Sequence, residues 1–240
     1  MTTTHIVALG GGGFSMSASG GVTPLDRYIV GLSDAKTPHV CFVPTASADD
    51  PRYINHFLTA YAPMGVRTSV LTLWQNARES IKRAMNEADV LLVGGGSTVN
   101  LVALWQAHGL SDAIRGLIKE RNIVLAGIAA GANVWFEACS TDSFGPELRP
   151  WYGGMGLITG SFCSHFDGEE RRAPDFANWV AEGRLPDGYG ADDGAALHVI
   201  PDGKTRYVAE NRKAKVHRVY GSFTPTTSGV IVEPLKTRMI

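Results

Sequence analysis

Short apolar runs alternate with amphipathic segments through the first half of the chain. The runs that we predict as strands are His5–Leu9, His39–Val43, Thr68–Leu73, Asp89–Val93 and Ile123–Ile128. Several are apolar throughout, which is typical of strands covered on both faces. Helical patterns lie between them, at Pro24–Gly31, Pro51–Tyr61, Arg78–Glu87, Thr98–His108 and Ser111–Glu120. This alternation predicts an α/β fold with a mostly parallel central sheet, flanked by helices and joined by right-handed crossovers.

The pattern changes after about residue 140. One further helix is predicted at Glu169–Glu182. Strands are predicted after it, at Ala195–Ile200, Thr205–Glu210 and Lys215–Tyr220, with a turn at Pro201–Gly203 between the first two. We expect these hairpin strands to complete one end of the sheet. Because no linker, repeat or low-complexity tract interrupts the chain, we predict a single domain over residues 1–240.

Composition narrows the class of protein. The 240 residues include 22 Lys and Arg against 23 Asp and Glu, a formal net charge of −1. With no basic excess to neutralise phosphates or anionic lipids, we expect neither a nucleic-acid nor a membrane partner. No apolar run approaches the ~20 residues that span a bilayer, and the segment Met1–His5 lacks the positive charge of a secretory signal. The isolated Cys41, Cys139 and Cys163 suit reduced thiols in the cytoplasm better than a disulfide or zinc framework.

Two glycine clusters follow predicted strands. The first, Gly10–Gly13, fails as a dinucleotide fingerprint because Ser15 and Met16 stand where GxGxxG requires its third glycine, so a nicotinamide-dependent enzyme is disfavoured. The second, Gly94–Ser97, joins a strand directly to a helix, and Ser97 can serve as the N-cap of that helix. This cluster is either a tight turn that packs strand against helix or a set of backbone N–H groups that bind an oxyanion or a carboxylate.

The segment Gly127-Ile-Ala129-Ala130-Gly131 follows an apolar strand and precedes a helical pattern. This is the arrangement of a nucleophile elbow, GxSxG, with Ala129 where the nucleophilic serine would stand. A methyl group cannot attack a carbonyl, so the sequence has the scaffold of a serine hydrolase without its nucleophile. The structural alternative is that these small residues only allow close packing of strand and helix.

Possible partners of this elbow lie downstream. His165 follows a predicted strand and is placed for a general base. Asp192 and Asp193 precede Gly194 in a loop from which an acid could orient that histidine, and Asp142 is a second candidate acid. Each of these residues also has a purely structural explanation. His165 could be an interfacial histidine, Asp192–Gly194 an ordinary turn, and Asp142 a local cap.

Together these segments resemble the peptidase E family of aspartyl dipeptidases, to which cyanophycinase is related. The matching motifs occur in order, at Gly94–Thr98, Gly127–Asn133, Ser164–Phe166 and Asp192–Gly194. The resemblance implies a scaffold like that of class I glutamine amidotransferases and a Ser-His-acid apparatus with no metal or organic cofactor. It also implies removal of an N-terminal Asp from short peptides, by a monomer or a homodimer.

The resemblance assigns roles by position. Ala129 occupies the nucleophile position, His165 is the general base, and Asp193 is the orienting acid, with Asp142 as the alternative. We expect Asp193 to lie closer than Asp142 to His165. The resemblance further implies oxyanion donors on the backbone of Ala130 and of the Gly95–Gly96 turn, and a guanidinium at Arg171 that pairs with the carboxylate of the substrate.

The alanine at position 129 leaves two explanations open. It is either an engineered replacement that lets a substrate bind without being cleaved, or a natural feature of a pseudoenzyme. In both cases we expect the chain as given to be inactive. The alternatives to a serine peptidase of the peptidase E type are a non-catalytic peptide-binding or interaction protein on the same fold and a cyanophycinase-like peptidase.

Overall fold

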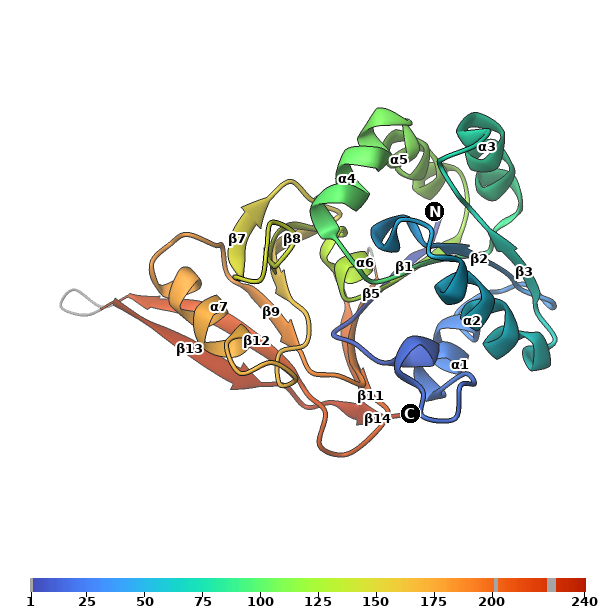
Figure 1. Cartoon of the computed structure of the whole chain (residues 1–240). Coiled ribbons are helices and arrows are strands. Elements are labelled where there is room, and N and C mark those ends of the chain that lie inside the picture. Colours follow the sequence, from blue (N-terminus) through green and yellow to red (C-terminus); the bar gives the residue numbers. More distant parts are fainter. Residues whose placement is uncertain (1, 201–202, 224–227) are drawn as a thin grey trace.

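A computed structural model describes residues 2–200, 203–223 and 228–240. Its central feature is an eight-stranded sheet in the order β14-β11-β10-β1-β5-β4-β2-β3 (Figure 1). Its strands are β1 Thr4–Leu9, β2 His39–Val43, β3 Arg67–Val70, β4 Val90–Val93, β5 Ile123–Ile128, β10 Ala195–Val199, β11 Thr205–Ala209 and β14 Arg238–Met239. From β1 through β5, β4 and β2 to β3 every pairing is parallel, while β10 pairs antiparallel with β1 and β11. The predicted mostly parallel α/β sheet is therefore confirmed.

Helices cover both faces of this sheet. The helices are α1 Pro24–Val30, α2 Pro51–Tyr61, α3 Ala77–Glu87, α4 Thr98–Ala107, α5 Leu110–Glu120, α6 Ala130–Asn133 and α7 Arg172–Ala181, with short 3-10 helices at Gly13–Met16, Thr45–Ser47 and Ala62–Met64. Helices α1 and α2 pack on one face, where Ile29 and Phe57 join a core with Val7 of β1. Helices α3, α4 and α5 pack on the other, where Trp105 and Ile114 join a core with residues of β4 and β5 (Figure 1). Strands buried between two helical layers account for the continuous apolar runs.

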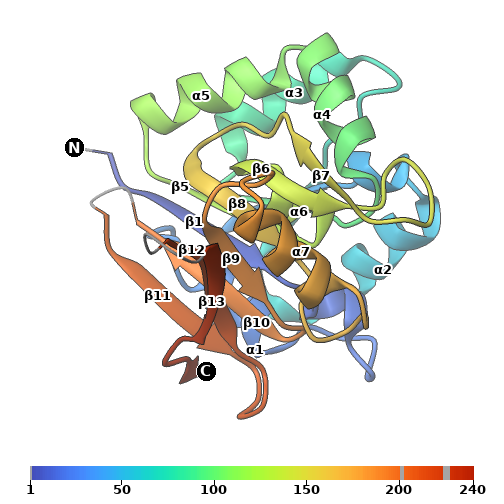
Figure 2. The ribbon, with the colours of Figure 1, turned by 90° about the vertical axis from the view of Figure 1, so that its left-hand side faces the viewer.

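A second, six-stranded sheet was not predicted. Its order is β13-β12-β9-β8-β6-β7, and its strands are β6 Phe136–Thr141, β7 Arg149–Tyr152, β8 Ile158–Cys163, β9 Gly188–Ala191, β12 Val216–Phe223 and β13 Ser228–Pro234. Helix α7 packs against it through Phe176 and Val180 (Figure 2). Of the three predicted C-terminal strands, two extend the central sheet as β10 and β11, but the third, β12, belongs to this second sheet. Pro201 and Asp202 of the predicted turn lie outside the described residues.

The strand-to-helix turn after β5 is held by close backbone packing. A Cβ atom added at Gly131 would lie 2.3 Å from the Val93 carbonyl oxygen and 2.9 Å from that of Gly94. We expect Gly131→Ala to lower the free energy of unfolding by about 1–3 kcal/mol, because backbone on both elements would have to shift. Chemical denaturation of the purified variants measures this.

Gly116 supplies the matched control. It lies within α5, and an added Cβ there would meet nothing within 4 Å. Gly116→Ala is therefore expected to raise stability by about 0.5–1 kcal/mol, since alanine loses less conformational freedom in a helix. Equal denaturation midpoints for the two variants would contradict this account of Gly131.

Candidate active site

A pocket of about 220 Å³ opens at the carboxyl ends of the parallel strands, where ligands bind in open α/β sheets. Its lining includes Gly96, Ala129, Asp142, His165, Glu169 and Arg172. These residues come from the ends of β4, β5, β6 and β8 and from the start of α7. The fold thus gathers into one pocket most of the positions singled out in the sequence.

Ala129 stands at the sharp turn between β5 and α6. Its backbone has φ 52° and ψ −109°, a conformation that residues with a side chain rarely adopt. Its N–H donates to the Leu9 carbonyl at 3.2 Å. A Cβ atom at Gly127 would lie 1.9 Å from the Gly131 carbonyl oxygen, so the turn requires glycine there. The backbone therefore has the strained geometry with which a nucleophile is raised above a sheet, and it carries a methyl group.

His165 follows β8 and also has a positive φ, of 51°. Its Nδ1 lies 2.6 Å from Oδ1 of Asp193, and both side chains are partly buried. In the tautomer whose Nδ1–H donates to this carboxylate, Nε2 is the ring nitrogen that can accept a proton. Asp193 is thus the carboxylate that contacts this histidine.

The first glycine cluster lies against this pair. A Cβ atom at Gly11 would lie 2.0 Å from Asp193 Oδ1 and 2.8 Å from His165 Nδ1. The Gly11 carbonyl accepts from the N–H of Gly194 at 3.0 Å, and His165 N–H donates to the Gly10 carbonyl at 3.1 Å. The cluster that fails as a dinucleotide fingerprint therefore leaves room for the His165–Asp193 contact. In the sequence, the run of glycines Gly10–Gly13 is the signal that could have indicated this close approach.

Asp142 lines the same pocket but contacts a different partner. Its Oδ2 lies 3.3 Å from Nη2 of Arg172, whose guanidinium also donates to Glu169 at 2.8 and 3.1 Å. The Arg172 side chain is 5% exposed, whereas both carboxylates are 51% exposed. Burial lowers the pKa of Arg172, but the hydrogen bond and charge of Glu169 help to raise it above its usual value overall. The pocket thus contains a buried cation covered by two accessible anions.

Arg171, expected to face a substrate carboxylate, does not line this pocket. Its side chain is 79% exposed and forms an ion pair with Asp175 at 3.0 Å, one turn along α7. Adjacent residues on a helix point about 100° apart. Arg171 faces solvent, whereas Arg172 lines the pocket. Arg172 is therefore the guanidinium that a ligand in this pocket would meet.

The second glycine cluster lies beside Ala129, but Gly95, expected with Gly96 to supply an oxyanion donor, does not line the pocket. A Cβ atom at Gly95 would lie 3.6 Å from the Ala129 Cβ, and Ser97 caps α4 as predicted by accepting from the N–H of Asn100. The N–H of Gly95 donates to Tyr53 Oη at 3.4 Å. Gly96 and Ala130 line the pocket, and Ala130, as the first residue of α6, has no acceptor for its N–H within the helix.

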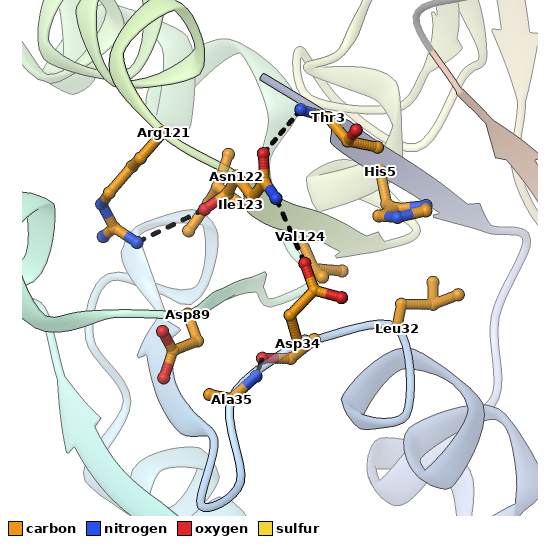
Figure 3. Close-up of a pocket in the computed structure, with 11 residues that line it drawn as sticks. Thr3, His5, Leu32, Asp34, Ala35, Asp89, Arg121, Asn122, Ile123 and Val124 are labelled. Atoms are coloured by element: carbon orange, nitrogen blue, oxygen red, sulfur yellow. Dashed lines mark hydrogen bonds between the residues drawn. The ribbon is translucent and has the colours of Figure 1, made fainter. Parts of the chain in front are cut away.

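A second cavity, of about 280 Å³, lies at the amino ends of β1 and β5 (Figure 3). Its polar groups bond to one another: Asn122 accepts from the N–H of Thr3 at 2.7 Å and donates to Asp34 at 3.1 Å (Figure 3). Arg121 donates to the Met85 carbonyl at 2.9 Å. This cavity lies at the edge of the sheet opposite to the carboxyl ends and contains none of the predicted site residues.

The described residues contain neither a metal-binding cluster nor a membrane-spanning helix. No group of three or more His, Cys, Asp or Glu side chains in that part of the chain is placed to hold a metal ion. No helix among the same residues is both long and apolar enough to cross a membrane.

Fold and site together define an α/β protein whose parallel sheet presents a strained strand-to-helix turn and a histidine–carboxylate pair at its carboxyl edge. That is the framework of a class of hydrolytic enzymes. Residues 6–207 match peptidase family S51, and the chain belongs to this family of peptidases. The resemblance to the peptidase E family is thereby confirmed.

Relatives cover most of the chain. It is 42% identical over 217 residues to the uncharacterized peptidase YgaJ of Bacillus subtilis (strain 168), covering 90% of this chain and 91% of that protein. It is 27% identical over 199 residues to the probable alpha-aspartyl dipeptidase of Drosophila melanogaster, covering 79% and 80% respectively. The crystal structure of a peptidase from an acI-B1 Actinobacterium has the same fold, with a TM-score of 0.68 at 16% identity over 97% of each chain.

Proposed function

We propose that this fold, with a serine at position 129, hydrolyses dipeptides or short peptides with an N-terminal Asp by a Ser-His-acid mechanism. The observation that carries the proposal is the 2.6 Å contact of His165 with Asp193 beside the strained turn at Ala129. The chain as given lacks the nucleophile and is inactive. The test is to restore the hydroxyl at position 129 and to assay an Asp-x dipeptide.

Residues of the pocket and its surroundings can be assigned to each step of peptide hydrolysis. Asp193 holds the imidazole of His165 so that Nε2 takes the proton of the hydroxyl at position 129. The oxygen then attacks the peptide carbonyl, and the N–H groups of Ala130 and Gly96 stabilise the charge that develops on the carbonyl oxygen. His165 returns the proton to the leaving amine, and a water molecule releases the acyl group by the same route.

The charges of the pocket suit an aspartyl residue with a free amino group. Such a residue brings one carboxylate and one ammonium, and the pocket offers the guanidinium of Arg172 with the carboxylates of Glu169 and Asp142. Guanidinium binds carboxylate in a bidentate manner, so the substrate carboxylate would replace Glu169 or Asp142 on Arg172, and the displaced acid would pair with the ammonium. The volume of about 220 Å³ suits a single residue as the group bound in this pocket.

The two neighbouring arginines give a matched test of this selectivity. In the Ala129→Ser protein, Arg172→Gln is expected to lower kcat/KM for Asp-Leu by about 10- to 100-fold, since it removes a buried charge that binds the substrate carboxylate. Arg171→Gln should change kcat/KM by less than about 2-fold, because that side chain is solvent-exposed. Steady-state kinetics with Asp-Leu and Asn-Leu, on variants with unchanged circular dichroism, make the comparison. Equal effects of the two substitutions would contradict the assignment.

A second candidate is a catalytically silent peptide-binding protein. The observation that favours it is the methyl group of Ala129 in a site that keeps its other groups. It requires that the chain as given and the Ala129→Ser variant bind the same peptide and that neither cleaves it. Calorimetry with mass spectrometry of the incubated peptide separates the two candidates.

A further inference from the structure

An apolar hollow lies beside the candidate active site, across the Gly94–Ser97 turn. Its volume is about 590 Å³, within the range of pockets that bind small ligands. Its lining includes Ala46, Ser47, Trp74, Asn100, Ala103 and Leu104. These residues lie at the carboxyl ends of β2 and β3 and on α4, so the hollow opens at the same edge of the sheet as the polar pocket.

Only the Gly94–Ser97 turn separates the hollow from the polar pocket. Gly96 lines the polar pocket, and a Cβ atom added to it would lie 2.2 Å from the Ala46 carbonyl oxygen. The N–H of Ser97 donates to that same carbonyl at 2.8 Å. On α4, Thr98 lines the polar pocket and Asn100 lines the hollow. Thr98 and Asn100 point to different sides of α4, so the two cavities lie on either side of this turn, and a ligand would have to pass over the turn to reach the hollow.

Trp74 is the principal apolar side chain of the hollow. It is 63% exposed, more than any other large hydrophobic residue of the described chain. An indole ring supplies a large, rigid contact surface, and its burial by a ligand removes apolar area from water. Trp74 lies in the loop that joins β3 to α3.

Positive φ at residues other than glycine occurs in the lining of both sites and in the chain next to the hollow. Among the described residues, positive φ at a position other than glycine occurs at Ala48, Asp49, Asn76, Ala129 and His165. Ala129 and His165 belong to the polar pocket. Ala48 lines the hollow, Asp49 follows it, and Asn76 stands two residues after Trp74. Such conformations persist only where the surroundings hold them, and they cluster at binding and catalytic sites.

The geometry points to a specificity subsite: the hollow binds a large apolar side chain on the residue that follows the scissile bond. This inference rests on the proposed function, since the polar pocket takes the first residue of the peptide. The hollow lies next to that pocket, across the Gly96–Ala46 contact, and this position favours a substrate side chain over a second copy of the chain as the occupant. The substrates would then be dipeptides and short peptides with a charged first residue and a bulky apolar second residue.

Binding to the chain as given tests the subsite without turnover. Calorimetry should show Asp-Phe binding about 10-fold more tightly than Asp-Gly, because only Asp-Phe fills the hollow. Trp74→Ala should reduce this ratio to less than about 3-fold, and Trp74→Phe should keep most of it. Tyr152→Ala is the matched control, since Tyr152 is 58% exposed but lines neither site, and it should leave the ratio unchanged.

Two results would overturn the subsite. One is equal affinity for Asp-Phe and Asp-Gly. The other is a Trp74→Ala variant that sediments as a smaller species with unchanged peptide binding, which would make the hollow an interface between copies.

Turnover by the Ala129→Ser variant separates this inference from the proposed function. If the variant cleaves Asp-Gly and Asp-Phe with equal kcat/KM, the proposed function holds and the subsite fails. If neither peptide is cleaved while the Trp74-dependent affinity is present, the proposed function fails and the apolar binding site stands.

Discussion

Ala129→Ser is expected to raise kcat/KM for Asp-Leu by about 10⁴- to 10⁶-fold over the chain as given. Loss of a catalytic serine costs a factor of this order in a well-studied serine protease, and the remaining groups retain only a small residual rate. Here the backbone of position 129 already has the strained φ of 52°, and His165 is already bonded to Asp193. The hydroxyl is the missing group, so adding it is expected to be sufficient.

The controls for this result use the same background. The double variant Ala129→Ser/His165→Ala should fall back to the rate of the chain as given, because the hydroxyl then has no base. A serine-directed phosphonate should add one adduct mass to Ala129→Ser and none to the unmodified chain, as read by intact-mass spectrometry. A folded Ala129→Ser protein with neither hydrolysis nor adduct would refute the mechanism.

The second large effect is expected at Asp193. In the Ala129→Ser protein, Asp193→Asn should lower kcat by about 10⁴-fold, because an amide at 2.6 Å from Nδ1 favours the wrong tautomer of His165. The loss should appear in kcat more than in KM, since Asp193 does not face the pocket that binds the substrate. Steady-state kinetics over a range of pH measure both constants.

Asp142→Asn is the matched comparison. Asp142 bonds to Arg172 at 3.3 Å, and no bond between Asp142 and His165 occurs in the described structure. We expect less than about a 10-fold change in kcat and a larger share of the effect in KM, through weaker binding of the substrate ammonium. A loss at Asp142 as large as that at Asp193 would make Asp142 the orienting acid.

The parallel sheet could be predicted because its strands are buried on both faces. Runs such as Val40–Val43 and Ile123–Ile128 are apolar throughout, and helices α2, α3 and α5 each have one apolar face. The second sheet could not be predicted in the same way. Strand β7 is only four residues long and half exposed, and β9 is glycine-rich. Strand β7 forms by pairing with β6, and β9 forms by pairing with β8 and β12, and the local pattern of hydrophobic residues does not report such pairings.

The candidate site, like the fold, could be predicted from the sequence only in part. Ala129 follows β5, a strand of clear pattern, and its place follows from the rule that ligands bind beyond the carboxyl ends of parallel strands. His165 follows β8 of the second sheet, so its meeting with Ala129 was predicted from the order of the motifs rather than from the strand pattern. The choice between Arg171 and Arg172 depends on the rotation of α7, which begins at Arg172 rather than at the predicted Glu169. A shift of one residue turns a different side chain inward. The role of Gly11 depends on contacts with residues more than 150 positions away.

The strained backbone at Ala129 bears on how readily alanine and serine can replace one another at this position. The positive φ is imposed by the packing of Gly127 and Gly131, not by the side chain, so the backbone keeps its shape whether or not a hydroxyl is present. Alanine and serine codons can differ by a single base. A change between alanine and serine at position 129 is therefore one mutational step, and the surrounding fold does not have to readjust to it.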